Sequence, residues 1–308
     1  MAMLLADVGG TNARLAIARN GVIDASSITR YRGEDYESFD RVVKTYMTEQ
    51  DNPRLSAVCV AVAGPVSGGK AELTNRDWDF SEDRLARLTD ADHVRLINDL
   101  TALGYATPHL EAEGVSILRN APAHRARNGQ SLVVGAGTGF NVCAVRSLPG
   151  GGIAAMEAEE GHTNLPSNIA RKLADRIGAE RMSAFFSTEE TFAGRGLAAM
   201  HHALHGEKVE RAEAISTAAM EGDGKAEETY QLFTELFGLL LRELALRFMP
   251  LDGMFLAGSV ARSFAHRTQS LETAFLAEPY MREIPENTPL LLIRDDMAAL
   301  HGCLAAIS

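Results

Sequence analysis

One strand–loop–strand pattern occurs twice in this chain, and it constrains the fold more than any other feature. Residues 4–19 (LLADVGGTNARLAIAR) and 131–146 (SLVVGAGTGFNVCAVR) both contain an apolar strand, a glycine loop with Gly-Thr, a second extended segment and a closing Arg. We interpret the pair as an imperfect internal duplication, which predicts two similar lobes. The length of 308 residues agrees with this prediction, because single hydrophobic cores stop growing at roughly 250–300 residues.

The first copy of the pattern predicts antiparallel strands. Asn20-Gly21 follows the second extended segment and is the strongest short hairpin signal, and Val22 begins a further extended segment. This arrangement differs from two common phosphate-binding motifs. The chain contains neither a G-x-x-x-x-G-K-[ST] P-loop nor a G-x-G-x-x-G that opens a helix.

The remaining periodic segments predict alternating helices and strands, as in an α/β fold. Residues 55–63 (LSAVCVAVA) are almost all apolar, which is typical of a strand buried on both faces. Ser81 is a candidate N-cap for the helix that follows it. We expect helices at 39–47, 82–88, 227–248 and 297–307, and further strands at 93–97, 253–257 and 290–293.

Charge and cysteine content exclude several classes of function. The net charge is −11 and no basic stripe is present, which argues against a nucleic-acid partner. The one basic cluster, Arg119–Arg127 (RNAPAHRAR), is rich in turn-forming residues, and we interpret it as a surface loop. Cys59, Cys143 and Cys303 lie far apart in apolar segments, so we expect buried free thiols rather than disulfides or a zinc site.

The chain also lacks the sequence signals of secretion and membrane insertion. No charged segment precedes the first apolar strand, as a signal peptide would require. The longest apolar run, Leu236–Leu241, is far shorter than the about 20 residues that span a bilayer. We therefore expect a cytoplasmic protein that does not bind a membrane.

The glycine loops carry groups that bind phosphate and magnesium. Consecutive backbone N–H groups around Gly9 and Gly10 can form a nest for an anion, and Thr11 adds a hydroxyl. Asp7, at the end of the preceding strand, can hold a magnesium ion through water. A Gly-Gly-Thr turn can also be a purely structural hairpin, but the second loop at 135–139 favours a nucleotide site.

Polar residues follow two other predicted strands, at the ends where α/β proteins usually place ligands. Asn98 offers a donor and an acceptor to a hydroxyl group, and Asp99 offers a carboxylate that can accept its proton. The alternative is a turn in which Asn98 and Asp99 only cap the next helix. The turn Gly258-Ser259, which ends a buried strand, suits an adenosine.

Together these loops and turns resemble the phosphate-1, phosphate-2 and adenosine motifs of the superfamily that contains actin, sugar kinases and heat-shock chaperones. Within it, the chain resembles the bacterial glucokinases over nearly its whole length. The segments that carry this resemblance, in the family's order, are 61–66 (AVAGPV), 73–81 (LTNRDWDFS), 96–103 (LINDLTAL), 134–142 (VGAGTGFNV), 157–165 (EAEEGHTNL) and 190–197 (ETFAGRGL).

The resemblance implies an α/β fold of two ribonuclease-H-like, actin-like ATPase lobes with a cleft between them. We expect residues 1–108 with 296–308 to form a small α/β lobe, and 109–295 to form a large α/β lobe. The resemblance further implies ATP and Mg²⁺ as cofactors, glucose as the small-molecule substrate, a role in glycolysis and a cytoplasmic homodimer. Closure of the lobes should exclude water from the reaction.

The resemblance also assigns residues to each ligand. For glucose it implies Asn98, Asp99, Glu159, His162 and Glu189, with Asp99 as the catalytic base. For the nucleotide it implies Ala6, Asp7, Val8, Gly9, Gly10, Thr11, Asn12, Gly137, Thr138, Gly139, Gly258 and Ser259, with Asp7 holding the magnesium through water.

Sequence spacing selects the acidic residues of the sugar site. Glu159 matches because the family spaces its Glu three residues before the His, whereas Glu160 stands where relatives carry a small residue. Glu189 is selected over Glu190 by its spacing from Gly194. The alternative interpretation is that these residues belong to solvated acidic loops.

The implied reaction transfers the γ-phosphoryl group of ATP to the 6-hydroxyl of glucose, mainly through positioning and charge stabilisation. Two alternatives stay open: a kinase for another hexose or an amino sugar, and a non-catalytic sugar-responsive regulator. Such regulators carry a DNA-binding helix-turn-helix before the glycine loop, which here begins at Asp7. His201, His202 and His205 invite a metal site, but HHALH lacks the Glu of a zinc protease, so we expect a partly exposed helix face.

Overall fold

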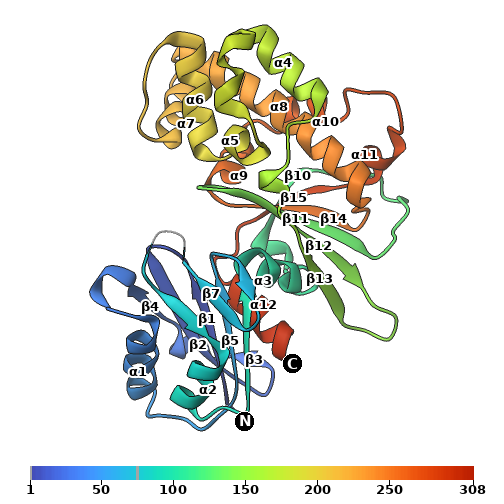
Figure 1. The fold of residues 1–308 in the computed structure, drawn as a ribbon. Coiled ribbons are helices and arrows are strands. Elements are labelled where there is room, and N and C mark those ends of the chain that lie inside the picture. The colour runs from blue at the N-terminus through green and yellow to red at the C-terminus, as the bar shows by residue number, and fades with distance from the viewer. Residues whose placement is uncertain (1, 74–75) are drawn as a thin grey trace. The chain divides into compact units, whose positions relative to one another are not determined.

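The computed structural model describes residues 2–73 and 76–308 (Figure 1). Thr74 and Asn75, within the LTNRDWDFS segment, lie outside the described residues. Contacts divide the chain into two compact units, which we call unit 1 (Met1–Leu110 with Asp295–Ser308) and unit 2 (Glu111–Arg294). The lobe boundaries expected from the sequence, 108/109 and 295/296, stay a prediction about functional lobes.

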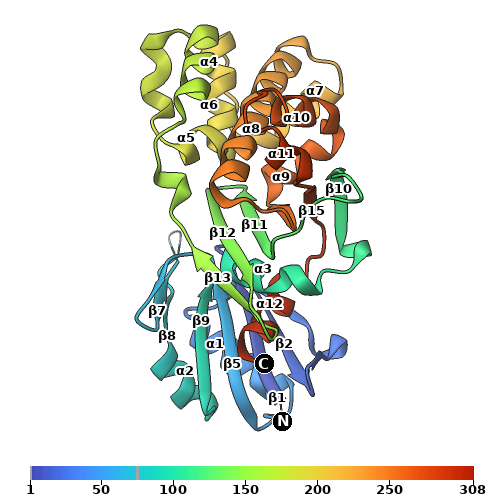
Figure 2. The same ribbon diagram turned by 90° about the vertical axis from the view of Figure 1, so that its right-hand side faces the viewer.

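Unit 1 is built on a sheet with the strand order β3-β2-β1-β5-β9, and β4 pairs with β2. β1 pairs antiparallel with β2 and parallel with β5, which in turn pairs parallel with β9 (Figure 2). The bounds are β1 (Ala2–Val8), β2 (Asn12–Arg19), β3 (Val22–Ile23), β4 (Thr29–Arg32), β5 (Leu55–Val62) and β9 (His93–Asn98). A small separate sheet contains β6 (Val66–Ser67), β7 (Lys70–Glu72) and β8 (Asp79–Ser81).

The predicted hairpin is confirmed by the backbone between β2 and β3. Asn20 has φ of 53° and Gly21 has φ of 77°, and a two-residue type I′ turn requires positive φ at both positions. The turn joins β2 to β3, which pair antiparallel.

Helices cover both faces of the unit 1 sheet. They are α1 (Phe39–Glu49), α2 (Glu82–Thr89), α3 (Asp99–Ala106) and α12 (Ala298–Ile307). Val58 of β5 belongs to the core that α1 and α2 cover, whereas its neighbour Cys59 belongs to the core that α3 and α12 cover. β5 is therefore buried on both faces, as predicted. Ser81 caps α2 by accepting a hydrogen bond from the Arg84 N–H.

Unit 2 repeats the topology of unit 1. Its sheet has the order β10-β15-β14-β11-β12-β13, and the path β13-β12-β11-β14-β15 follows the same antiparallel and parallel pairings as β3-β2-β1-β5-β9. The bounds are β10 (Val115–Arg119), β11 (Gln130–Ala136), β12 (Phe140–Ser147), β13 (Ile153–Glu157), β14 (Gly253–Ala257) and β15 (Leu290–Ile293). The duplication in the sequence is thus a duplication of sheet topology, and the predicted fold of two ribonuclease-H-like units is confirmed.

The helices of unit 2 pack around α8, whose apolar side chains fill the core together with Phe192 and Phe264. Asp223 caps α8 by accepting a hydrogen bond from Ala226 N–H, and Met249 ends the helix with φ of 44° just before Pro250. The helices are α4 (Ser167–Ile177), α5 (Thr188–Phe192), α6 (Gly194–His205), α7 (Ala212–Met220), α8 (Gly224–Phe248), α9 (Ser259–Ser263), α10 (Thr268–Phe275) and α11 (Glu283–Asn287).

The prediction of a surface loop at Arg119–Arg127 is wrong for its first residue. Arg119 ends β10, and its guanidinium is buried. It donates to the carbonyl oxygens of Thr288 and Glu286 and forms an ion pair with Glu272. The short alternation of Val115–Arg119 was too brief to predict a strand, and these carbonyl partners explain how a guanidinium can be buried there.

The histidine cluster on α6 lies on a partly exposed helix face, as expected, but His201 itself is buried. His201 is only 4% exposed, because its side chain packs toward α8 and its Nδ1 lies 2.9 Å from Thr229 Oγ1. His205 Nε2 lies 3.2 Å from the same hydroxyl, whereas His202 is exposed. Burial lowers the pKa of His201. Among residues 2–73 and 76–308, no three His, Cys, Asp or Glu side chains form a metal-binding group.

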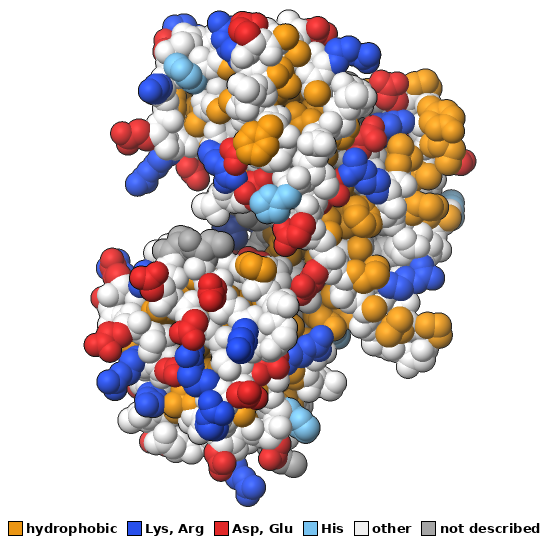
Figure 3. Space-filling model, in the orientation of Figure 1, with side chains coloured by type: hydrophobic (Ala, Val, Ile, Leu, Met, Phe, Trp, Pro, Cys, Tyr) orange, Lys and Arg blue, Asp and Glu red, His pale blue; other side chains and the backbone are white. Residues whose placement is uncertain are grey.

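Two further features concern the surface and the thiols. Cys59, Cys143 and Cys303 are buried and form no disulfide, as predicted. None of the helices in the described part of the chain combines the length and apolarity needed to cross a bilayer. On the face drawn in Figure 3, acidic and basic side chains are interspersed over unit 1.

Candidate active site

The first glycine loop joins β1 to β2 and is held by backbone hydrogen bonds. Gly9 N–H donates to the carbonyl of Asn12, and the Thr11 carbonyl accepts from Gly33 N–H. Arg76 Nε donates to the Gly10 carbonyl at 3.3 Å. The N–H of Gly9 closes the turn, so it is not among the donors that this loop can offer to a phosphate.

Asp7 and Asp99 come to the same edge of the unit 1 sheet. β1 and β9 run parallel on either side of β5, so their carboxyl ends meet at one edge. Burial raises the pKa of the Asp7 carboxyl, and the charge of Arg14 opposes this shift. Burial, together with the negative charge of Asp7, raises the pKa of Asp99 to about 6, against the hydrogen bond that Leu100 N–H donates. Asp99 is therefore a far better proton acceptor near neutral pH than an exposed aspartate.

Asn98 connects the end of β9 with two other segments. Its Oδ1 accepts a hydrogen bond from Leu100 N–H at 2.9 Å, which caps α3. Its Nδ2 donates to the Gly64 carbonyl at 3.1 Å, in the turn after β5. The capping contact considered as an alternative is thus present, and it fixes the amide in one orientation with further hydrogen-bonding capacity for a ligand.

In unit 2, three glycine turns lie against one another. Gly194 N–H donates to the carbonyl of Gly137, and Gly137 N–H donates to that of Gly139. Gly258 has φ of 101°, and a Cβ there would lie 2.3 Å from the Ala136 carbonyl oxygen. The two turns predicted for phosphate and adenosine therefore touch through their backbones, and only glycine fits at Gly258.

Glu189 is bound to the same loop. Its Oε2 accepts from Phe140 N–H at 2.8 Å, and its Oε1 accepts from Arg195 Nη2 at 2.5 Å. A Cβ on Gly139 would lie 2.7 Å from Glu189 Oε2, so the glycine leaves the space that this carboxylate occupies. The carboxylate of Glu190 accepts hydrogen bonds from Arg195, which lower the pKa of Glu190.

The two neighbouring glutamates after β13, Glu159 and Glu160, differ in their exposure and in their partners. Glu159 is exposed, and its Oε2 lies 3.7 Å from His162 Nε2 and 3.3 Å from Asn141 Nδ2. Glu160 is buried, forms an ion pair with Arg247 of α8, and accepts from Thr163 Oγ1. Glu159 is thus the member of the pair that is available to a ligand.

The family model described as Glucokinase matches residues 4–308.

The chain belongs to the glucokinase family.

One relative of this glucokinase-family chain is a glucokinase of Marinobacter nauticus, 28% identical over 319 residues that cover 99% of this chain and 96% of the relative. The crystal structure of a glucokinase from an Antarctic psychrotroph superposes with a TM-score of 0.86 at 25% identity, covering 99% of this chain and 98% of that one. A ROK family glucokinase from Streptomyces griseus, solved in complex with glucose and AMPPNP, has a TM-score of 0.59 at 18% identity, with 98% of each chain covered. At that identity the likeness concerns the fold alone.

Three residues that contact the candidate site were not predicted from the sequence. Arg195, Asn141 and Gly64 each contact a residue predicted to bind ligand. All three lie within segments that carried the family resemblance, namely 190–197, 134–142 and 61–66, but the resemblance gave none of them a role.

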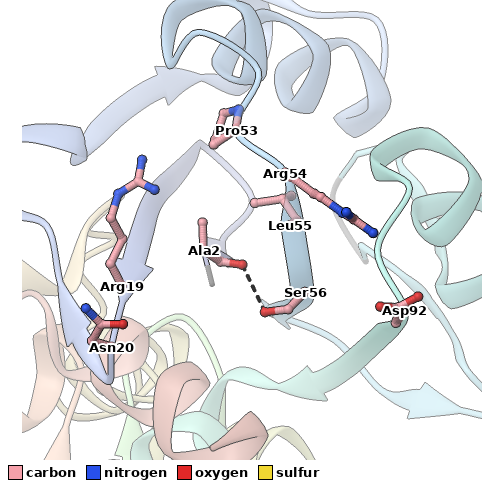
Figure 4. Close-up of a pocket in the computed structure, with 8 residues that line it drawn as sticks. All are labelled: Ala2, Arg19, Asn20, Pro53, Arg54, Leu55, Ser56 and Asp92. Carbon is pink, nitrogen blue, oxygen red and sulfur yellow. Dashed lines mark hydrogen bonds between the residues drawn. The ribbon is translucent and has the colours of Figure 1, made fainter.

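Figure 4 shows a cavity of about 560 Å³ that is separate from these residues. It lies at the start of β1 and β5, where the Ser56 hydroxyl donates to the Ala2 carbonyl, and thus at the opposite edge of the sheet from Asn98. Its lining residues are Ala2, Arg19, Asn20, Pro53, Arg54, Leu55, Ser56 and Asp92. None of them was predicted to bind glucose or nucleotide.

Proposed function

We propose that this chain catalyses transfer of the γ-phosphoryl group from ATP to the 6-hydroxyl of glucose, giving glucose 6-phosphate and ADP. Family membership supports this activity, and one structural observation carries the chemistry. Asp99 is a partly buried carboxylate at a strand end, and its pKa is raised to about 6. This is the property expected of a base that accepts a proton from a sugar hydroxyl.

In the proposed reaction, Asp99 takes the proton from the 6-hydroxyl as its oxygen attacks the γ-phosphorus. The bond between the γ-phosphorus and the bridging oxygen breaks, and ADP leaves with that oxygen. Asn98, held by its contacts with Leu100 and Gly64, orients the sugar. Catalysis of this kind depends mainly on positioning and on stabilisation of charge.

We assign the other sugar hydroxyls to three residues of unit 2. Glu159 and His162 lie on one exposed turn, and Glu189 is fixed by Phe140 N–H and Arg195. The phosphates are assigned to the loops Gly10–Asn12 and Gly137–Gly139, and the adenosine to Gly258-Ser259, which touches the second loop. These assignments rest on the family resemblance and on the contacts described above.

We propose that Mg²⁺ is held near Asp7 through water. The residues suit a cation, because the carboxylates of Asp7 and Asp99 repel one another. Burial raises the pKa of Asp7, and the charge of Arg14 opposes this rise. Magnesium prefers oxygen ligands and keeps several of its waters, which suits one carboxylate better than a full protein cage. When bound, the ion would neutralise charge on the ATP phosphates. A cytoplasmic homodimer is proposed on the family resemblance alone.

The activity is tested by measuring ADP release with glucose, mannose, fructose and N-acetylglucosamine. Glucose should give the highest kcat/KM. A clear preference for fructose or N-acetylglucosamine would instead support the alternative of a kinase for another hexose or an amino sugar. ADP release with no sugar dependence in a folded, ATP-binding protein would contradict the proposed function altogether.

A further inference from the structure

Arg195 contacts both the second glycine loop and an acidic residue assigned to glucose. Its Nη1 donates to the Thr138 carbonyl at 3.0 Å. Its Nη2 donates to Glu189 Oε1 at 2.5 Å and to Glu190 Oε1 at 2.8 Å. The three partners come from the loop between β11 and β12 and from α5, so one guanidinium joins two elements whose proposed ligands differ.

These contacts are part of a closed ring. Gly194, the residue before Arg195, donates its N–H to the Gly137 carbonyl at the start of the loop. The Glu189 carboxylate contacts the other end of the loop, where its Oε2 accepts a hydrogen bond from Phe140 N–H at 2.8 Å. The space above Gly139 is occupied by the Glu189 carboxylate. A displacement of the loop therefore changes the position of Glu189, and a displacement of Glu189 changes the position of the loop.

The charge on Arg195 strengthens its hydrogen bonds to Thr138, Glu189 and Glu190. Hydrogen bonds that the guanidinium donates to Glu190 and Glu189 raise its pKa, so it remains charged at any physiological pH. Charge-assisted bonds of this planar fork are shorter and more directional than neutral hydrogen bonds. Arg195 is about half exposed, so its partners determine its position more than close packing does.

We propose that Arg195 couples the nucleotide site to the sugar site. It is a positioning residue: phosphate binding at Gly137–Gly139 fixes the loop, the loop fixes the guanidinium through Thr138, and the guanidinium fixes Glu189 for the sugar. Because coupling between two ligands is reciprocal, glucose must strengthen nucleotide binding by the same factor. The inference rests on the proposed function of these two sites.

The test is calorimetric measurement of the glucose Kd with and without saturating AMPPNP and Mg²⁺. In the wild type we expect AMPPNP to lower the glucose Kd by about fivefold or more, the lower end of typical coupling. In Arg195→Met this factor should fall close to 1. Arg195→Lys should give an intermediate factor, because one ammonium cannot reproduce the fork to Thr138 and Glu189. Unfolding curves establish which variants are folded, and the Lys variant carries the test if the Met variant is not.

Glu190→Gln is the matched control. It removes a charge that contacts Arg195 but leaves the path from Thr138 to Glu189 intact, so the coupling factor should stay at the wild-type value. A wild-type factor of 1, or an unchanged factor in folded Arg195→Met, would overturn the inference. Failure of the proposed function is distinguishable, because the wild type would then neither bind glucose nor phosphorylate it.

Discussion

At the scale of single residues, the reaction depends on Asp99. Asp99→Asn keeps the shape of the side chain but removes the proton acceptor. We expect kcat to fall by about 10²–10⁴-fold, the usual contribution of a general base, while the glucose Kd changes far less because an amide can still pair with a hydroxyl. Steady-state kinetics and calorimetry on the folded variant provide the measurement. Retention of more than about a tenth of the wild-type kcat would exclude Asp99 as the base.

The raised pKa of Asp99 predicts a pH dependence. Because this pKa rises from 3.8 to about 6, kcat/KM should increase with pH and level off above about 6, as the base becomes ionised. The stability of the fold depends on pH in the opposite direction. Between pH 3.8 and about 6 the Asp99 carboxyl binds more protons in the folded state than in the unfolded state, so its contribution to the free energy of unfolding falls as pH rises. A pH profile whose acid limb lies near 4 would contradict the shift.

The buried neighbour of Glu159 gives a third prediction. Glu160 and Arg247 tie the turn that carries Glu159 and His162 to α8. Arg247→Met should raise the KM for glucose by roughly tenfold, as expected for loss of a charge-assisted hydrogen bond, with little change in the KM for ATP. The double variant with Glu160→Gln, which no longer buries an unpaired carboxylate, should recover part of the loss. Equal increases in both KM values would indicate general damage instead.

At the scale of elements, the glycine loops can be tested with a matched pair. A Cβ on Gly139 would lie 2.7 Å from Glu189 Oε2, whereas a Cβ on Gly137 would meet its nearest neighbour, Ser259 N, at an ordinary 3.5 Å. Gly139→Ala should therefore displace Glu189 and raise the KM for glucose several-fold, and Gly137→Ala should leave it nearly unchanged. If both variants behave alike in sugar kinetics, Glu189 is not a sugar ligand.

Periodicity determined which elements the sequence could predict. β5 was predicted because a parallel strand buried on both faces is a continuous apolar run, and the hairpin because Asn20-Gly21 favours positive φ. β10 and β13 were missed because both are five-residue edge strands, and in the two strands only Leu118 and Arg119 are buried. Short edge strands give a weak period, and their pairing depends on partners distant in the sequence.

The candidate site was less predictable than the fold, for a different physical reason. Sequence spacing selected Glu159 over Glu160, but only packing against α8 reveals that Glu160 is buried with Arg247. In the same way, spacing gave no role to Arg195, whose partners lie 57 residues away at Thr138 and six residues away at Glu189. Contacts of this kind arise from tertiary structure, so no local pattern encodes them.

At the scale of the whole molecule, unit 1 depends on a distant segment of the chain. α12 crosses α3 at Gly302, where a Cβ would lie 1.7 Å from the Ala102 carbonyl oxygen. Gly302→Ala should force the helices apart and cost about 1–3 kcal/mol or more, as overpacking does. Differential scanning calorimetry should show a lower melting temperature, and Gly224→Ala, whose Cβ meets nothing within 4 Å, serves as the control. Equal melting temperatures would mean that α12 does not hold unit 1 together.

The same connectivity has a consequence for biosynthesis. A ribosome makes the chain from its N-terminus, so the strands of unit 1 emerge first, yet α12 follows all of unit 2. Until α12 arrives, the face of the sheet around Leu5 and Cys59 lacks the cover that Leu300 and Cys303 provide. Unit 2 is continuous in the chain and can complete its core earlier. The nascent protein must therefore keep an apolar surface from aggregating for most of its translation, and a chaperone that binds such surfaces would act on unit 1 rather than on unit 2.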